Sequence, residues 1–142
     1  MDNFLIRDFI SDDYDSLMNL WEKTGLGGSK RGDNKEIILD SIKLGGKLLV
    51  MIDSENNILI GSSWMTFDGR RFHLHHFGIL PEYQGKKLSN KLVEESVLFS
   101  KNRGYQIKLE VHKDNAIAIN LYKKYGFQYL GDYDVYIIRQ YN

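Results

Sequence analysis

Residues 115–127 read NAIAINLYKKYGF, a run with the spacing of an amphipathic helix. Asn115, Ala118 and Tyr122 lie at i, i+3 and i+7, and therefore share one stripe of that helix. Because alanine is small, a thin ligand fits along this stripe between the amide and the phenol. The structural alternative is that Asn115 only caps the helix and Tyr122 only packs, and the pattern alone favours neither.

The same helix has a second stripe and a defined end. Ile117, Leu121 and Tyr125 form an apolar stripe that is predicted to face the core. Gly126 follows the last helical residue, as glycine often does where a helix ends in the left-handed conformation. The sequence therefore predicts a helix from about Asn115 to Tyr125.

Strands are predicted on both sides of this helix. The run 107–112 precedes it and carries Glu110 on the face opposite three apolar side chains. The runs 127–131 and 135–139 follow it as two closing strands.

A second segment, from Gly78 to Ser89, takes a strand through a glycine-containing loop into a helix. The first N–H groups of a helix lack partners inside it, and the helix dipole favours negative charge at that end. A phosphate or pyrophosphate would suit such a turn. The alternative is a plain strand–helix connection, since many such turns bind nothing.

The remaining elements follow from hydrophobic periodicity and turn signals. Ser11–Asp13 offers N-cap chemistry for a first helix, and Asp68-Gly69 is a strong hairpin signal. The further predicted strands are 4–9, 47–53, 58–67 and 71–80, and the further helices are 14–21, 37–42 and one opening at Gln84-Gly85. The order βααβββαβαββ predicts an α/β fold of one sheet with helices.

Composition excludes several classes of protein. With 142 residues, 42% of them apolar, residues 1–142 are expected to form a single domain. Nineteen basic and nineteen acidic residues cancel, which argues against a nucleic-acid binder that works through bulk positive charge. The chain has no cysteine, which excludes disulfides and thiol nucleophiles. Because it has no membrane-spanning run and no signal-peptide pattern, we expect a cytoplasmic protein that binds no membrane.

Together the two segments resemble motifs B and A of the GNAT superfamily, the Gcn5-related N-acetyltransferases that use acetyl-CoA. Residues 115–127 match every fixed position of the family's N-x-x-A-x-x-L-Y-x-x-x-G-F run, and the element order is similar over essentially the whole chain. The resemblance implies an α/β (α+β) fold with a mixed, mostly antiparallel central sheet of about six to seven strands and about four flanking helices.

The other motif departs from the family at one position. The family's phosphate loop reads Q/R-x-x-G-x-G/A, and Lys87 stands here where a glycine is usual. If the loop requires a positive φ there, Lys87 costs about 1 kcal/mol, which its ammonium offsets if it reaches a phosphate. We therefore expect CoA binding to be retained.

In this family an amine attacks the thioester of acetyl-CoA directly. The resemblance implies that backbone groups of residues 77–79 bind the pantetheine arm and the thioester carbonyl, and that the pyrophosphate lies on residues 84–89. Tyr122 matches the general acid that protonates the departing thiolate, and Asn115 matches a residue that contacts the pantetheine side or positions the acceptor. The implied cofactor-binding residues are Phe77, Gly78, Ile79, Gln84, Gly85, Lys86, Lys87, Leu88, Ser89, Asn115 and Tyr122.

Two residues are candidates for the general base. Glu110 lies twelve residues before Tyr122, a spacing that resembles the Glu…Tyr pair of the family's ribosomal-protein N-terminal acetyltransferases. His73 lies six residues before Ile79, where histone-acetylating members carry their glutamate. We place Glu110 first and His73 second; the structural alternatives are a solvated strand face and a partly buried histidine.

The run His73-Leu74-His75-His76 also raises the question of a metal site. On one strand His73 and His75 share a face while His76 is predicted to point away, so that at most two ligands converge. We therefore expect no metal and place His75 in the wall of the acceptor pocket.

The favoured function is transfer of an acetyl group from acetyl-CoA to a primary amine. The alternatives are a catalytically degenerate acyl-CoA-binding regulatory module and a scaffold that binds no CoA. The acceptor, a small molecule or a protein N-terminus, stays open, although Lys30-Arg31 would suit an acidic one. If the chain forms a homodimer, as is common in the family, we expect the apolar C-terminal strands at the interface.

Overall fold

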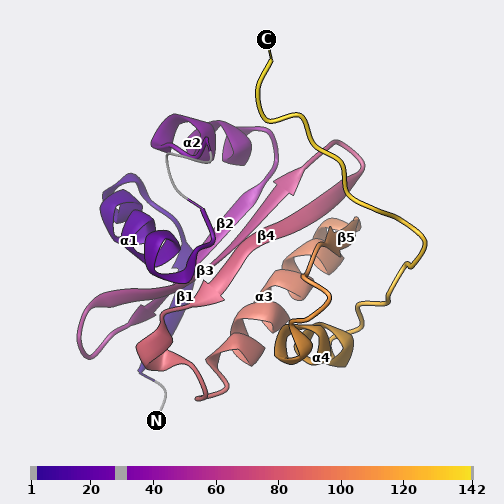
Figure 1. The fold of residues 1–142 in the computed structure, drawn as a ribbon. Coiled ribbons are helices and arrows are strands. Elements are labelled where there is room, and N and C mark those ends of the chain that lie inside the picture. The colour runs from indigo at the N-terminus through magenta and orange to yellow at the C-terminus, as the bar shows by residue number, and fades with distance from the viewer. Residues whose placement is uncertain (1–2, 28–31, 142) are drawn as a thin grey trace.

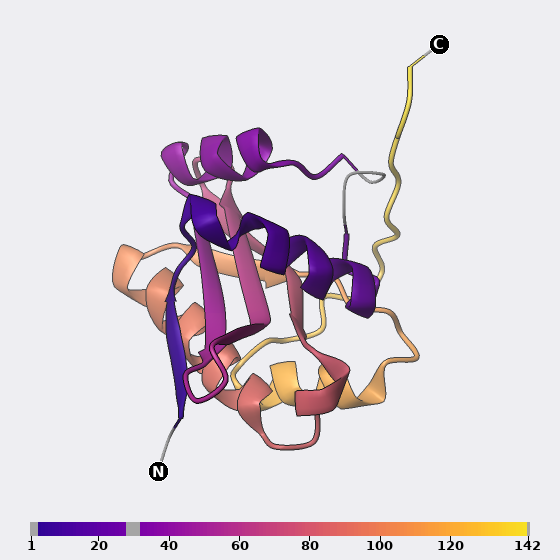
Figure 2. The ribbon, with the colours of Figure 1, turned by 90° about the vertical axis from the view of Figure 1, so that its left-hand side faces the viewer.

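The computed structural model describes residues 3–27 and 32–141 of the chain. Within these residues a five-stranded sheet lies between two pairs of helices (Figures 1 and 2). One face carries α1 (Tyr14–Thr24) and α2 (Lys35–Lys43), and the other carries α3 (Leu88–Arg103) and α4 (Ala116–Lys124). The strands are β1 (Phe4–Asp8), β2 (Lys47–Asp53), β3 (Ile58–Phe67), β4 (Arg71–Ile79) and β5 (Gln106–Leu109).

The strands lie in the sheet in chain order. Neighbours from β1 to β4 are antiparallel, whereas β5 pairs with β4 in parallel after the crossover through α3. Short 3-10 turns at Ser11–Asp13 and Pro81–Tyr83 precede α1 and the loop to α3. The predicted α/β class and the order of the first nine elements are confirmed.

Aromatic side chains join both helix layers to the sheet. Trp21 of α1 is fully buried and stacks on Trp64 of β3, with ring centroids 5.5 Å apart. On the other face Phe72 of β4 lies 5.0 Å from Phe99 of α3. The sheet is therefore covered on both faces.

The boundaries of the central strands agree with the prediction, but the helix predicted to open at Gln84-Gly85 begins at Leu88. Gly85 and Lys87 have φ angles of +81° and +63°, a left-handed conformation that no α-helix continues through. The strand predicted at 107–112 is the shorter β5, and Glu110 lies just beyond its end.

The two closing strands, predicted at 127–131 and 135–139, are wrong: residues 128–141 form no strand or helix, and the sheet has five strands rather than six or seven. A strand requires a neighbouring strand for its hydrogen bonds, and this segment runs outside the sheet (yellow in Figure 1). Gly131 and Asp132, with φ angles of +61° and +56°, also interrupt the extended backbone. The segment leaves large apolar side chains exposed, at Tyr129, Leu130, Tyr133, Val135, Tyr136, Ile137, Ile138 and Tyr141.

β4 is longer than its parallel partner, and this opens the sheet. The β4–β5 pairing ends at Leu74 and Leu109, while β4 continues to Ile79. The register between β3 and β4 also shifts between Ser62 and Trp64, which is a β-bulge. Among the residues that the structure describes, no strand therefore lies beside one edge of the second half of β4.

None of the helices in the described part of the chain is long and apolar enough to cross a membrane.

Candidate active site

The open edge of β4 lies next to α4, which carries the predicted acid. The rings of Phe77 and Tyr122 meet edge to face at 5.8 Å, and Phe127 lies 5.6 Å from Tyr122 on its other side. Burial raises the pKa of the Tyr122 phenol to about 12. Tyr122 is therefore protonated at neutral pH and lies beside the open edge of the sheet.

Asn115 caps α4, because its side-chain oxygen accepts a hydrogen bond from the N–H of Ala118 at 3.2 Å. The capping role that the sequence left open is thus present. The predicted apolar stripe is wrong at Ile117, which is 86% exposed. Residues 115–117, the first turn of α4, are exposed to solvent.

The loop before α3 has the geometry of an anion-binding turn. The Gln84 side chain donates to the carbonyl of Ile79 at 2.9 Å, which ties the loop to the end of β4. Gly85 and Lys87 both take the left-handed conformation, and α3 starts directly after them. Its first N–H groups, those of Leu88 and Ser89, come at the end where the helix dipole favours an anion.

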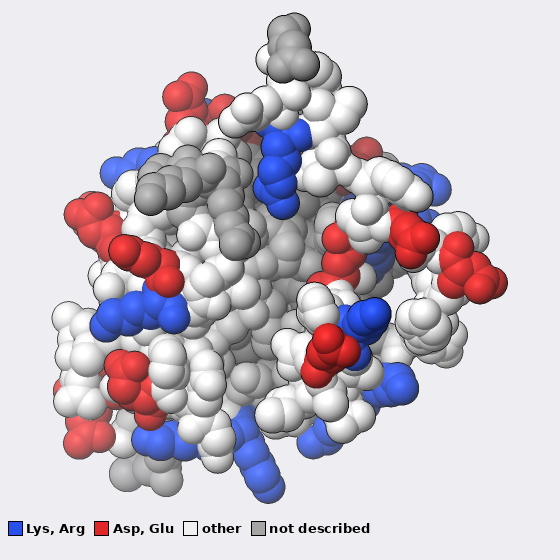
Figure 3. Space-filling model, viewed as in Figure 1, with Lys and Arg blue, Asp and Glu red and all other residues white. Residues whose placement is uncertain are grey.

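Figure 3 shows a hollow in the middle of this face of the molecule and basic side chains along its lower edge. In the same view of the ribbon, the loop before α3 lies at that lower end (Figure 1). The Lys86 ammonium lies 5.3 Å from the centre of the Tyr83 ring, and this lysine lines a separate pocket next to the loop.

The two base candidates lie side by side on the α1–α2 face of the sheet. His73 Nε2 and Glu110 Oε1 are 3.8 Å apart, and both side chains are about half exposed. Burial lowers the pKa of His73, and the nearby Glu110 carboxylate partly opposes this effect. His73 is thus neutral at pH 7, and both groups are able to accept a proton.

The prediction that His76 points away from the other histidines is wrong. The bulge in β4 breaks the alternation of side chains, and His76 has a φ of +47°. Its Nδ1 lies 2.6 Å from Nδ1 of His75, and the rings of His73 and His75 are 5.5 Å apart. In the described residues, however, no group of three or more His, Cys, Asp or Glu side chains is arranged to hold a metal ion.

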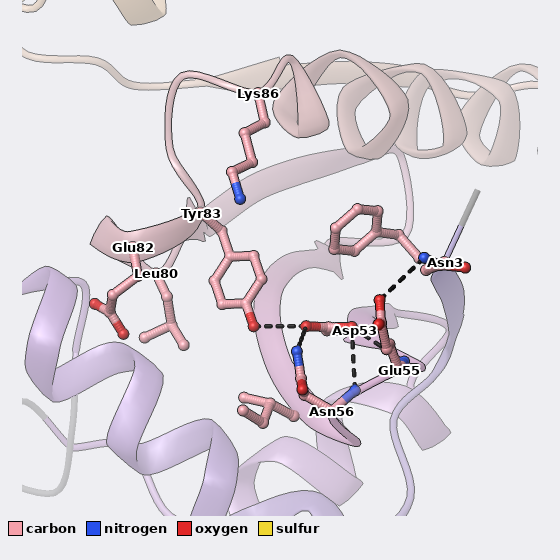
Figure 4. Close-up of a pocket in the computed structure, with 10 residues that line it drawn as sticks. Asn3, Asp53, Glu55, Asn56, Leu80, Glu82, Tyr83 and Lys86 are labelled. Atoms are coloured by element: carbon pink, nitrogen blue, oxygen red, sulfur yellow. Dashed lines mark hydrogen bonds between the residues drawn. The ribbon is translucent and has the colours of Figure 1, made fainter. Parts of the chain in front are cut away.

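A separate open pocket of about 490 Å³ lies on the other side of the Pro81–Tyr83 turn (Figure 4). The Tyr83 hydroxyl donates to Asp53 at 2.6 Å, and this bond, with that from Asn56, lowers the pKa of the Asp53 carboxyl. Two more carboxylates, Glu55 and Glu82, line the pocket. Its acidic lining makes it a poor site for a pyrophosphate.

The sequence model of the Acetyltransferase (GNAT) family matches residues 14–127, which include α1, the β4 edge, the loop before α3 and most of the residues around Tyr122. The chain belongs to the GNAT acetyltransferase family. This GNAT chain is therefore an acyltransferase, as predicted.

Curated and solved relatives agree with the family. An acetyltransferase of Pectobacterium atrosepticum is 26% identical over 124 residues, which cover 87% of this chain and 86% of the relative. A GNAT acetyltransferase of Staphylococcus aureus has the same fold, with a TM-score of 0.76, 17% identity and coverage of 92% and 89% of the two chains. Arabidopsis thaliana Naa50, solved with the bisubstrate analogue CoA-Ac-MVNAL, has a TM-score of 0.74 at 18% identity, over 89% of this chain and 84% of its own.

The structure brings most of the predicted site residues to one region, the end of β4 and the elements beside it. Lys30 and Arg31, predicted to suit an acidic acceptor, lie outside the described residues. Sequence reasoning missed the contact of His76 with Asp33, at 2.9 Å. No signal in the sequence could have found this contact, because adjacent histidines on a regular strand face opposite sides and nothing in the sequence pointed to Asp33.

Proposed function

We propose that this GNAT protein transfers the acetyl group of acetyl-CoA to a primary amine by direct attack. The observation that carries the proposal is the position of Tyr122, a partly buried, protonated phenol against Phe77 at the open edge of β4. A group that stays protonated at neutral pH can donate to the departing CoA thiolate.

The same geometry supports acetyl-CoA as the proposed cofactor. Backbone groups of residues 77–79 take the pantetheine arm and the thioester carbonyl, and residues 84–89 take the pyrophosphate. Hydrogen bonds from fixed N–H groups to the thioester carbonyl stabilise the negative charge that develops on it as the amine attacks. Asn115, as the cap of α4, holds the start of the helix that carries Tyr122.

The attacking amine must first lose a proton. At pH 7 this costs about 4–5 kcal/mol for a lysine-like amine and about 1 kcal/mol for an α-amino group. We assign the proton to Glu110 or His73, which lie together on the face of the sheet opposite Tyr122. The acceptor class, a small-molecule amine or a protein N-terminus, follows from the family and from relatives such as the complex with CoA-Ac-MVNAL.

The proposed unit is one GNAT domain over residues 1–142, able to form a homodimer through the apolar segment 129–141. A second candidate function, acyl-CoA binding without turnover, is favoured by Lys87, whose left-handed conformation would be cheaper for the family's usual glycine.

The first test is a thermal melt with acetyl-CoA, CoA and adenosine 3′,5′-bisphosphate. Ligand at about 100 times Kd stabilises a protein by about 2.7 kcal/mol, which raises the midpoint by several degrees in a domain of this size. We expect shifts with acetyl-CoA and CoA, and then acetyl transfer in a panel of amines. Saturable binding without transfer to any amine and without thioester hydrolysis would favour the regulatory module, and no shift at millimolar ligand would overturn both.

A further inference from the structure

His76 has an unusual backbone conformation at the place where β4 leaves β5. Its φ of +47° lies in the left-handed region, which side chains other than glycine rarely adopt. Trp64 pairs with His75 and Ser62 pairs with Gly78, so Ser63 of β3 faces two residues of β4. Such a conformation persists only where the surrounding contacts hold it.

The bulge decides where the following N–H groups point. In the hairpin before the bulge, the N–H of Asp68 donates to the carbonyl of Arg71, so the backbone groups of Arg71 point toward β3. Every second residue of a regular strand points the same way, so that without the bulge the N–H of Phe77 would also point toward β3. After it, Leu80 N–H donates to the carbonyl of Ile60 on β3 at 2.7 Å. The N–H groups of Phe77 and Ile79 therefore point to the other edge, where β5 no longer runs beside β4.

The side chain of His76 is held at both ring nitrogens. Nε2 lies 2.9 Å from Asp33 Oδ2, and Nδ1 lies 2.6 Å from Nδ1 of His75. The side chains of Asp33 and His76 are only 11% and 16% exposed. This well-shielded pair joins the bulge to the segment just before α2.

The backbone of the bulge is held as well. The carbonyl of His76 accepts a hydrogen bond from the Ser62 hydroxyl at 2.7 Å, and Ser62 accepts one from the Trp21 indole at 2.9 Å. The His76 ring also lies 4.4 Å from Trp21 and 5.1 Å from Trp64. His76, the strained residue, is thus held through its ring, through its backbone carbonyl and by the Asp33 carboxylate.

The hydrogen bonds fit one arrangement of protons. In it, Asp33 Oδ2 accepts from Nε2–H of His76, whose Nδ1 then accepts from Nδ1–H of His75. Nε2 of His75 in turn accepts from the Thr66 hydroxyl at 3.2 Å. Burial and its histidine neighbours lower the pKa of His75 to about 3, so that His75 stays neutral as this arrangement requires.

Gly27 allows the pair to form. A Cβ at residue 27 would collide with both the Asp33 carboxylate and the His76 ring. The φ of Gly27 is not in the left-handed region, so alanine is acceptable to the backbone there. Residue 27 is therefore a place where one added methyl group would separate Asp33 from His76.

We infer that Asp33 and His76 are positioning residues: together they hold the β4 bulge that points the Phe77 N–H at the thioester carbonyl. This inference rests on the proposed function, and it assigns Asp33, His76 and Gly27 a role in carbonyl polarisation rather than in CoA affinity. The pair acts through the backbone of Phe77 and does not itself contact the reacting atoms.

The test is isotope-edited infrared spectroscopy of acetyl-CoA that carries ¹³C at the thioester carbonyl. Bound to the native protein, the carbonyl is expected to stretch at lower frequency than in solution, because a hydrogen bond weakens the C=O bond. In Gly27→Ala, Asp33→Leu and His76→Val we expect this shift to be lost, with CoA affinity unchanged within about twofold. Thioester hydrolysis, followed as free thiol, should fall about tenfold or more, since loss of a whole oxyanion donor costs about 10²–10³ in rate.

The matched control is His112→Val, because His112 is an exposed histidine with its own aspartate, Asp114, at 3.7 Å. It should behave like the native protein. His76→Asn should retain part of the shift, since asparagine tolerates the left-handed conformation, and it serves if a harsher variant does not fold.

An unchanged carbonyl shift in CoA-saturated Gly27→Ala and His76→Asn would overturn the inference and leave the proposed function intact. Binding of acetyl-CoA to the native protein without any carbonyl shift would likewise overturn the inference and leave the proposed function intact. If the native protein fails to bind acetyl-CoA at all, the proposed function falls, and this inference falls with it.

Discussion

Tyr122 is a phenol with little water around it, which fixes its protonation state. Because burial raises its pKa to about 12, it remains an acid across the working range of pH. Tyr122→Phe removes only the hydroxyl, so acetyl-CoA should bind with unchanged affinity while kcat falls about 10²-fold or more. Steady-state kinetics and calorimetry with acetyl-CoA measure the two effects separately.

Tyr125→Phe is the control for this prediction. Tyr125 lies on the same helix end, but its hydroxyl donates to Asn90 at 3.1 Å rather than facing the open edge of β4. Its removal should leave kcat unchanged within about twofold, and equal losses in both variants would contradict an acid role for Tyr122.

The pairing of His73 with Glu110 permits a test of which one accepts the proton. The Glu110 carboxylate raises the pKa of His73 against the effect of burial, so Glu110→Gln should lower that pKa further. If His73 is the base, the acidic limb of the pH–rate profile moves to lower pH and the maximal rate survives. If Glu110 is the base, the rate falls about 10²-fold or more at every pH.

In His73→Asn the outcomes are exchanged: the rate falls at every pH if His73 is the base, and the maximal rate survives if Glu110 is the base. Unchanged pH–rate profiles in both single variants, measured with the same amine, would show that neither group is the base.

The positions of some candidate site residues could be predicted from sequence because they depend on local spacing. The helix stripe that carries Tyr122 follows from periodicity within thirteen residues, and the loop before α3 follows from one strand–helix turn, whereas the roles of both are implied only by the resemblance to the family. The Asp33–His76 contact could not be predicted, because it joins residues 43 positions apart through a bulge that breaks strand alternation. The meeting of His73 and Glu110 depends on the parallel register of β4 and β5, which single-strand patterns do not contain.

At the scale of elements, the loop before α3 carries the main departure from the family. Lys87 has a φ of +63°, which glycine adopts without strain. Lys87→Gly should therefore raise the free energy of unfolding by about 0.5–1 kcal/mol, and thereby the melting temperature by about 2–4 °C. If the Lys87 ammonium contacts a phosphate, the same variant binds CoA more weakly.

Gly85→Ala is the opposite change in the same loop, because Gly85 has a φ of +81°. It should melt lower than the native protein. A lower melting temperature for Lys87→Gly would contradict the strain argument.

The junction of β1 with α1 depends on an ion pair. Arg7 donates to both carboxylate oxygens of Asp13, at 2.7 and 2.9 Å, and the N–H of Ile10 donates to one of them. The bond from Arg7 lowers the pKa of Asp13 below its ordinary 3.8. This stability is therefore present above about pH 4 and is lost as the pH falls through the folded-state value.

Asp13→Asn should consequently unfold at lower denaturant than the native protein at pH 7, and the difference should shrink below pH 4. Urea titrations at several pH values measure it. A difference that is the same at all pH values would show that the charge of Asp13 is not responsible.

The strands that are buried on both faces, β2 and β3, were predicted to the residue. The C-terminal runs carry the same β-forming residues, yet they form no strands, because strand propensity describes a fit to neighbouring strands rather than an intrinsic preference. The sequence pattern of a strand does not indicate whether a neighbouring strand is available to pair with it.

For the whole molecule, the apolar segment 129–141 is the largest departure from a polar surface. Tyr136 is 89% exposed and Ile137 67%. Patches of this kind mark interaction surfaces, so we expect the protein to self-associate at micromolar concentration. Light scattering after size exclusion should show a dimer, and Ile137→Asp should shift it toward monomer. A native protein that is monomeric throughout the range would exclude this interface.

The chain-order sheet also has a consequence for how the molecule assembles. β2, β3 and β4 pair through short turns, whereas β1 reaches β2 only after α1 and α2, and β5 reaches β4 only after α3. Loop closure must precede contacts between distant segments, so the meander of β2 to β4 should form first, and β1, β5 and α4 should join it later. The gap between β4 and β5 is then created late in folding, so that destabilising substitutions in β5 or α4 should speed unfolding more than they slow folding.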